Sequence, residues 1–122
     1  MGGWAMIDLT LPFPPSVNTV WRRVGNRTLL SKRGRQYRKD VAAAVAEQWQ
    51  GDPLMGRVAV EIEVWPPDRR KRDIDNSLKA ALDAITHAGV WGDDEQIDRI
   101  LLSRGPVVSG GQCYVSIEEL AQ

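Results

Sequence analysis

The sequence predicts an α+β fold, a single domain over residues 1–122 in which two helices pack on a small mixed β-sheet. Three observations predict it. The length of 122 residues suits one hydrophobic core. Segments of alternating apolar residues, typical of half-buried strands, are interleaved with two segments whose apolar residues recur every three or four positions. Proline, glycine or a capping residue separates most segments, and the sequence contains no internal repeat.

The first predicted elements are all strands. Alternating apolar residues predict a strand over residues 5–11, which ends at Pro12. After a proline-rich loop, residues 21–24 and 27–30 are expected to form a strongly basic hairpin. Its two central residues are glycine and asparagine, which tolerate the positive φ that tight hairpin turns require.

The first helix is predicted over residues 32–50, with Ser31 as its N-cap and Gly51 just beyond its end. Basic residues fill its first two turns, where the helix dipole favours anions, so helix stability does not explain them. Phosphate binding and a solvated charged face both stay open as interpretations. The apolar stripe of this helix consists of Tyr37, Val41, Ala44, Val45 and Trp49.

The second half of the chain begins with the clearest strand pattern, over residues 57–65. A second helix is predicted over residues 76–88, because its apolar stripe ends just before Gly89, a suitable C′ residue. A strand over residues 97–103 and a last strand, separated by a Gly-Gly turn, complete the sheet. The last strand is expected to direct Cys113, Val115 and Ile117 inward.

Composition limits the kinds of site that the chain can build. One cysteine, Cys113, and one histidine, His87, allow neither an intramolecular disulfide nor a Cys- or His-based zinc site. Any bound metal must therefore be held by oxygen ligands. No apolar stretch approaches the roughly 18 residues of a membrane helix, and Asp8 and Pro12 interrupt any signal-peptide segment. We expect a cytoplasmic protein without a membrane partner.

Charge is balanced overall, with 16 basic and 16 acidic residues, but segregated along the chain. Residues 22–39 hold eight basic residues and no acidic one, and residues 69–72 add four more. Residues 73–98 hold seven acidic residues against Lys79 alone. The basic segments suit a polyanion, whereas the carboxylates repel one another unless water or cations surround them.

One spacing within the acidic segment is informative. Asp73 and Asp75 are two residues apart, which in an extended chain places both carboxylates on one side. Alternatively, Asp75 or Asn76 caps the helix that follows. Lys79 and Asp83 continue at intervals of one helical turn, so we expect both on one flank of that helix. The pair Asp93-Asp94 lies in the turn after the helix.

These aspartates suit Mg²⁺, which takes hard oxygen ligands and keeps several of its waters. An ion held there can activate water for attack on a phosphodiester, while Lys79 stabilises the developing charge. The competing interpretation is a surface ion pair between Asp75 and Lys79, worth only about 0.3 to 0.5 kcal/mol.

Longer motifs resemble a known family. The segment Pro67-Asp-Arg-Arg-Lys-Arg-Asp-Ile-Asp-Asn76, then Lys79, Asp83 and Gly89-Val-Trp-Gly-Asp-Asp94, resembles the signature region of the RusA family of phage-derived Holliday-junction resolvases. Leu11-Pro-Phe-Pro-Pro-Ser-Val-Asn18 is similar to the family's N-terminal PPS-x-N segment, and Val108-Ser-Gly-Gly111 to its C-terminal hairpin. The resemblance covers nearly the whole chain. Residues 1–5 and the basic block 32–39 lie outside the closest match.

The resemblance implies a homodimeric, Mg²⁺-dependent endonuclease that places paired nicks across a four-way DNA junction in recombination and repair, with Mn²⁺ as an alternative ion. It implies metal binding by Asp73, Asp75, Asp94 and Asp93. Lys79 and Arg72 would be the basic residues of the catalytic site. We expect arginines of the basic segments to bind DNA: Arg22, Arg23, Arg27, Arg33, Arg35, Arg70 and Arg72.

Two other functions stay open: a dimeric DNA-binding protein without catalysis, and a small Mg²⁺-dependent nuclease with another nucleic-acid substrate. The need for two opposed nicks favours a two-fold dimer, and the five tryptophans are consistent with a self-association surface. Trp21, between basic residues, is expected in the core or at an interface, with base stacking as the alternative. Trp49, Trp65 and Trp91 are expected to pack, and His87 to be a surface residue of a helix end.

Overall fold

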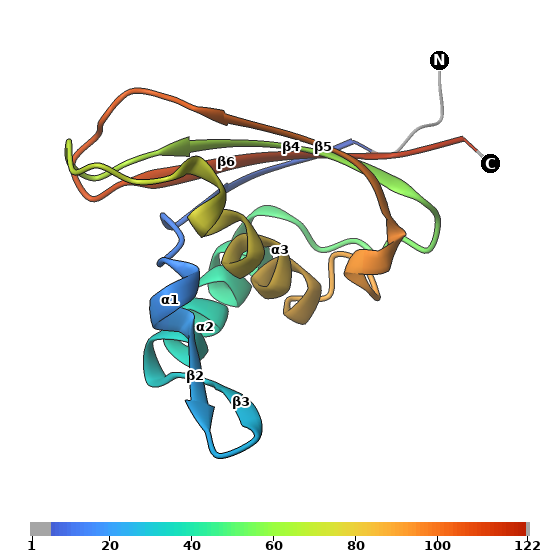
Figure 1. Cartoon of the computed structure of the whole chain (residues 1–122). Coiled ribbons are helices and arrows are strands. Elements are labelled where there is room, and N and C mark those ends of the chain that lie inside the picture. The colour runs from blue at the N-terminus through green and yellow to red at the C-terminus, as the bar shows by residue number, and fades with distance from the viewer. Residues whose placement is uncertain (1–5, 122) are drawn as a thin grey trace.

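The computed structural model describes residues 6–121, and Figure 1 shows a β-sheet with helices packed on one of its faces. The sheet has the order β1-β6-β4-β5, with β1 (Met6–Leu11), β4 (Val58–Trp65), β5 (Ile97–Arg104) and β6 (Gln112–Glu119). β4 and β5 are parallel, whereas β6 is antiparallel to both of its neighbours. The sheet is therefore mixed, and the predicted α+β fold is confirmed.

Two long helices, α2 (Lys32–Gln48) and α3 (Leu78–His87), form the second layer (Figure 1). Three short helices connect the larger elements: α1 (Val17–Val20) and the 3₁₀ helices η1 (Ile74–Ser77) and η2 (Asp94–Gln96). The predicted basic hairpin is present as β2 (Trp21–Val24) and β3 (Arg27–Leu30). It projects from the helical layer on the side away from the sheet (Figure 1).

The core lies between the sheet and the helices and follows the predicted alternation. In β4, Val58, Val60, Ile62 and Val64 are buried against the helices, while Glu61 is exposed on the open face. The predicted inward residues of the last strand and most of the α2 stripe are buried as well: Cys113, Val115, Ile117, Tyr37, Val41 and Val45.

Several element boundaries differ from the predicted ones. The helix α2 ends two residues early, at Gln48, because Trp49 takes extended backbone angles (φ −154°, ψ 130°). The second helix begins earlier than residue 76, as the 3₁₀ turn η1. The helix α1, capped by Ser16, was not predicted, because the prolines before it favoured a loop. Residue 5 of the first predicted strand lies outside the described residues.

The predicted packing of Trp49, Trp65 and Trp91 is confirmed. Trp91 is 1% exposed, and its Nε1 donates a hydrogen bond to Thr86 Oγ1 at 2.6 Å. Trp49 and Trp65 are half-buried. Within residues 6–121 no tryptophan belongs to the exposed large apolar residues, and Trp21, Trp49 and Trp65 are each partly exposed. Their part in a self-association surface stays a prediction.

The helices of the described residues are all too short or too polar to cross a membrane.

The burial of Cys113 gives a test of the fold. Its side chain is 0% exposed, and burial raises the pKa of its thiol to about 12. Since the thiolate is the reactive form, we expect the folded protein to resist modification by a disulfide reagent at about pH 8. The same reagent should modify one thiol per chain rapidly in guanidinium chloride. Equal rates in the two solutions would contradict the inward orientation of β6 at Cys113.

Candidate functional site

A surface cleft of about 410 Å³ lies where the proline-rich loop after β1 meets the segment between β4 and α3. Two sets of residues line it, three from the loop and six from the segment. They are Phe13, Pro14 and Ser16, with Arg70, Lys71, Arg72, Asp73, Asn76 and Ser77. Three of the nine are cationic and one is acidic, so the cleft suits an anion such as a phosphate.

Polar contacts fix the shape of the basic segment. Arg72 Nη1 lies 2.8 Å from Asp68 Oδ1, and the backbone N–H of Arg70 donates to the same oxygen at 2.9 Å. The Arg72 hydrogen bond is the main reason that the pKa of Asp68 is lowered, followed by the backbone bond. Arg72 also lies over the ring of Phe13, 5.6 Å from its centroid. Arg104 of β5 donates to the Arg72 carbonyl at 2.8 Å, which joins the segment to the end of the sheet.

Asp73 and Asp75 lie at the start of η1. Asp73 is the extended residue before the helix and lines the cleft, whereas Asp75 is inside the 3₁₀ turn and does not. The chain is therefore not extended through both residues, as the spacing argument assumed, because it enters η1 directly after Asp73. The capping alternative is not observed either, because Ser77 is the N-cap residue of α3. Both carboxylates are exposed and accept no hydrogen bond from residues 6–121.

Lys79, in the first turn of α3, interacts with an aromatic ring. Its Nζ lies 5.3 Å from the centroid of the Trp21 ring, a cation–π distance. No ion pair joins it to Asp75 within the described residues, so the competing interpretation of a surface pair is not supported. Trp21 is half-buried at the base of the hairpin, as expected for a packing residue. The hairpin is thus anchored beside Lys79.

Asp83 holds two helices together. Its two carboxylate oxygens accept hydrogen bonds from Arg38 Nε at 2.9 Å and Nη2 at 3.0 Å, across the α2–α3 contact. These bonds raise the pKa of the Arg38 guanidinium. Lys79 and Asp83 lie one turn apart on α3, as predicted. Asp83, however, pairs with Arg38 of the basic block, so both of these residues serve the packing of α2 against α3.

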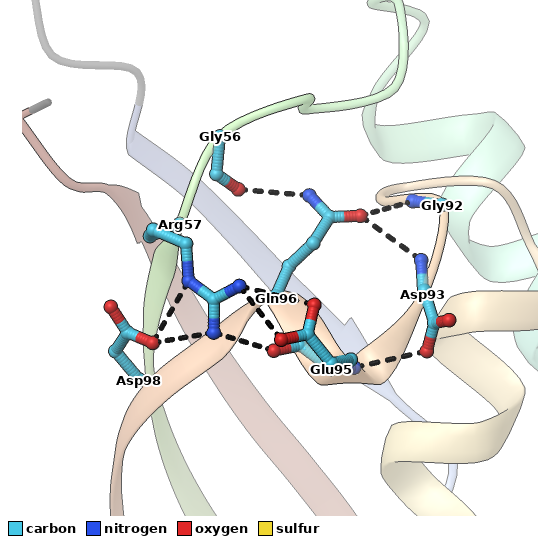
Figure 2. A network of polar contacts seen from close by, with 7 residues as sticks. All are labelled: Gly56, Arg57, Gly92, Asp93, Glu95, Gln96 and Asp98. Carbon is cyan, nitrogen blue, oxygen red and sulfur yellow. Dashed lines mark hydrogen bonds and ion pairs between the residues drawn. The ribbon is translucent and has the colours of Figure 1, made fainter.

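The Asp93-Asp94 turn lies at the other end of α3 and is fixed by a polar network (Figure 2). Asp93 caps η2 through a hydrogen bond from the Glu95 N–H at 3.0 Å. The Gln96 side chain binds the Gly92 and Asp93 N–H groups and, through Nε2, the Leu54 and Gly56 carbonyls. Arg57, just before β4, pairs with Glu95 and Asp98.

Within the turn formed by residues 92–98, Asp94 is the one acidic residue that neither caps η2 nor pairs with Arg57. It is exposed, and its carboxylate makes no hydrogen bond or ion pair with the residues that the structure describes. Within the acidic segment, the carboxylates without such contacts are Asp73, Asp75 and Asp94, and they lie at opposite ends of α3 (Figure 1). No group of three or more potential metal ligands forms within residues 6–121. One chain does not gather the predicted metal-binding aspartates.

Asp73 and Asp75 nonetheless fit a hard cation. Their oxygens are solvent-accessible and free of protein hydrogen bonds in the described structure. Mg²⁺ commonly binds through one or two carboxylates, several waters and a substrate phosphate. The adjoining cationic cleft supplies a place for that phosphate.

The predicted DNA-binding arginines fall into two groups. Arg70 and Arg72 line the cleft. The others lie on the hairpin or in the first turn of α2 and are exposed: Arg22, Arg23, Arg27, Arg33 and Arg35. Of these five, Arg35 donates to the Leu30 carbonyl at 2.8 Å.

Four residues that line the cleft have no site role in the prediction from the sequence: Phe13, Ser16, Lys71 and Asn76. A signal was present, since Ser16 belongs to the Pro-Pro-Ser-Val-Asn motif and Phe13 directly precedes it. What the sequence did not show is that this loop folds against the segment 70–77.

Known proteins are similar to this chain along almost all of it. The profile of the family described as endodeoxyribonuclease RusA matches residues 12–118. The crossover junction endodeoxyribonuclease rusA of Enterobacteria phage HK97 is 43% identical over 113 residues, 93% of this chain and 94% of the phage protein. The RusA proteins of Escherichia coli K12 and Enterobacteria phage 82 are 41% and 40% identical, covering 93% and 92% of this chain and 94% and 93% of their own lengths.

The Arg38–Asp83 pair yields a stability prediction. Its side chains are 29% and 24% exposed, so we expect Asp83→Ala and Arg38→Ala each to lower the free energy of unfolding by about 1 kcal/mol. The double variant should lose about as much as either single variant, because both remove one shared interaction. Urea unfolding of the four proteins measures this. Additive losses would show that the pair contributes nothing as a pair.

Proposed function

The chain belongs to the RusA family of endodeoxyribonucleases, and from this premise we propose that it resolves four-way (Holliday) DNA junctions by paired symmetric nicks. The observation that carries the proposal is the free pair Asp73 and Asp75 beside a cationic cleft. A protein that only binds DNA has no use for such carboxylates, because they weaken phosphate affinity unless a cation offsets them.

In this proposal the arginines bind and position the substrate. The hairpin stands away from the sheet and presents Arg22, Arg23 and Arg27 without protein partners in the described residues. Such arginines bind backbone phosphates and set the orientation of the duplex, not its sequence. Arg72 is held by Asp68 and Phe13 at the cleft, so it can orient a phosphate beside Asp73 with little loss of side-chain entropy.

We propose Mg²⁺, or Mn²⁺ in its place, as the cofactor, with Asp73 and Asp75 among its ligands. When bound, the ion supplies Lewis-acid chemistry and a water of lowered pKa. Lys79 stabilises charge that develops on the phosphate during cleavage. Its contact with Trp21 restricts the lysine and connects it to the DNA-binding hairpin.

Paired nicks require two sites, and we propose a homodimer for this reason. A four-way junction has approximate two-fold symmetry, which an isologous dimer matches. The substrate places the activity in the cytoplasm, where chromosomal and phage DNA recombine.

One assay separates this function from the alternatives. A gel assay compares a four-way junction, a linear duplex and an RNA hairpin, each with and without Mg²⁺. We expect nicking of the junction alone, and only with the metal. Equal cleavage of duplex or RNA would contradict junction selectivity, and cleavage of none would contradict nuclease activity.

Replacing one free carboxylate should separate binding from catalysis. We expect Asp75→Asn to abolish junction cleavage while junction affinity stays equal or increases, because the change removes a ligand charge that also repels phosphate. Single-turnover cleavage and an equilibrium binding titration measure the two properties. Glu61→Gln is the matched control, since Glu61 is exposed on the open face of β4, away from the helices and the cleft. Near wild-type cleavage by the Asp75→Asn variant would show that Asp75 is not part of the site.

The hairpin arginines should contribute to affinity through charge. Removing Arg22 and Arg23 as Ala should make the slope of log K against log salt shallower by about 0.9 for each lost phosphate contact. The control is Arg22→Lys with Arg23→Lys, which keeps the charge and should keep the slope. An unchanged slope in the alanine variant would show that Arg22 and Arg23 form a solvated face and do not contact DNA.

A further inference from the structure

We propose that Val24 and Leu29, on the outward face of the β2–β3 hairpin, pack against the open faces of base pairs at the centre of branched DNA. The outward hairpin face consists of Arg22, Val24, Arg27 and Leu29. This inference rests on the proposed function and adds to it the part of the chain that distinguishes a junction from a linear duplex. It follows from the register of the hairpin, from the way the hairpin is held and from the charge around it.

The register of the hairpin divides its side chains between two faces. Arg22 pairs with Leu29, and Val24 pairs with Arg27. Residues that pair directly, or that lie two apart on one strand, point to the same side of a β-ribbon. These four side chains therefore share one face, and all four are exposed. The opposite face consists of Trp21, Arg23, Thr28 and Leu30.

Contacts at the base of the hairpin fix which face turns outward. Trp21 and Leu30 pack against the hydrophobic core. The first turn of α2 also approaches the base closely, because a Cβ at Gly34 would lie 2.8 Å from Leu30 Cδ1 and 2.9 Å from the Val20 carbonyl oxygen. The face with Trp21 and Leu30 is thus turned to the body of the protein at its base, and the outward hairpin face is turned to solvent on the projecting hairpin (Figure 1).

Two apolar side chains adjoin on the outward hairpin face. Val24 is 44% exposed and Leu29 is 37% exposed. Their pairing partners make them diagonal neighbours across the two strands, about 7 to 8 Å apart. Single exposed apolar residues are common on protein surfaces. Here, however, two of them form one patch, and Arg22 and Arg27 occupy the other diagonal.

The charge around this patch favours a nucleic acid as its partner. Arg22 and Arg27 flank the patch, and Arg33 and Arg35 follow in the first turn of α2. Residues 22–39 hold eight basic residues and no acidic one. Such a segment attracts a polyanion, which in the proposed function is DNA. Apolar side chains that bind DNA beside cationic ones frequently insert between base steps and unstack them.

The patch distinguishes branched from linear DNA through the cost of exposing a base face. In a linear duplex each base pair is stacked on both sides, so an apolar side chain must first unstack two of them. At the centre of a junction the strand exchange interrupts the stack, and the cost of opening a base face is lower. The arginines bind backbone phosphates of either DNA. Val24 and Leu29 gain contacts only where a base face is open.

Binding without Mg²⁺ tests this role, because cleavage then does not intervene. The double variant Val24→Thr, Leu29→Thr keeps every charge and places residues that suit strands in both positions. We expect its affinity for a four-way junction to fall about tenfold, because the burial of two apolar side chains is lost. Its affinity for a linear duplex and its slope of log K against log salt should stay at the wild-type values. The unchanged slope would also show that the hairpin keeps its place.

Two control proteins accompany this variant. Val24→Ile with Leu29→Ile keeps the face apolar and should keep the junction preference. Met55→Thr removes an apolar side chain that is 84% exposed in the loop before β4, and it should bind both DNA molecules as the wild type does.

Disulfide trapping locates the contact on the DNA. The Leu29→Cys variant is mixed with junctions in which one base carries a short tether ending in an activated disulfide, placed either beside the crossover or in the middle of an arm. The cysteine thiolate displaces the leaving thiol and joins the protein to the tether. Cys113 does not interfere, because it is buried and the pKa of its thiol is about 12. We expect the covalent product beside the crossover and little in the arm.

Three results would overturn the inference while leaving the proposed function intact. An unchanged junction affinity of the double threonine variant would show that the patch faces solvent or another partner. An equal loss of affinity for junction and duplex would show that it does not discriminate between them, and so would equal trapping at crossover and arm. Wild-type protein that binds junction and duplex alike would instead contradict the proposed junction substrate, and this inference with it.

Discussion

The parallel pairing of β4 with β5 is the constraint on which the rest of the structure depends. Parallel neighbours cannot be joined by a tight turn, so the chain must travel back along the length of the sheet before β5 can begin. Here α3 makes that return. The segment before α3 lies at the end of β4, and the turn after α3 lies at its start. This crossover places Asp73 and Asp75 at one end of the sheet and Asp93 and Asp94 at the other.

Polar side chains hold both ends of the crossover, which explains why only some of the carboxylates are free. At the end of β4, Asp68 and Arg104 fix the segment that carries Arg72. At its start, Arg57 and Gln96 fix the turn before β5. Asp83 and Asp93 serve packing and capping in the same way. Within the acidic segment, the carboxylates left without a structural partner are Asp73, Asp75 and Asp94. These are three of the four to which the family resemblance assigns metal binding, and the fourth, Asp93, is a helix cap.

The fold was largely predictable because its signals are local, whereas the assembly of the site was not. Alternation over 58–65 and the cap at Ser31 depend only on neighbouring residues, and both are confirmed. The prediction that aspartates before and after α3 meet used the order of residues along the chain, which says nothing of the distance that a crossover imposes. Two further features needed the tertiary structure: the 3₁₀ turn that begins directly after Asp73, and the Arg38–Asp83 contact between helices.

The crossover also connects the residues proposed to bind DNA with those proposed to bind the metal. Arg104 of β5 donates to the Arg72 carbonyl and so joins the basic segment to the end of the sheet. Lys79, in the first turn of α3, contacts Trp21 at the base of the hairpin. In the proposed function, a phosphate held by the cleft or the hairpin is therefore positioned beside the start of α3, and little rearrangement is needed before cleavage.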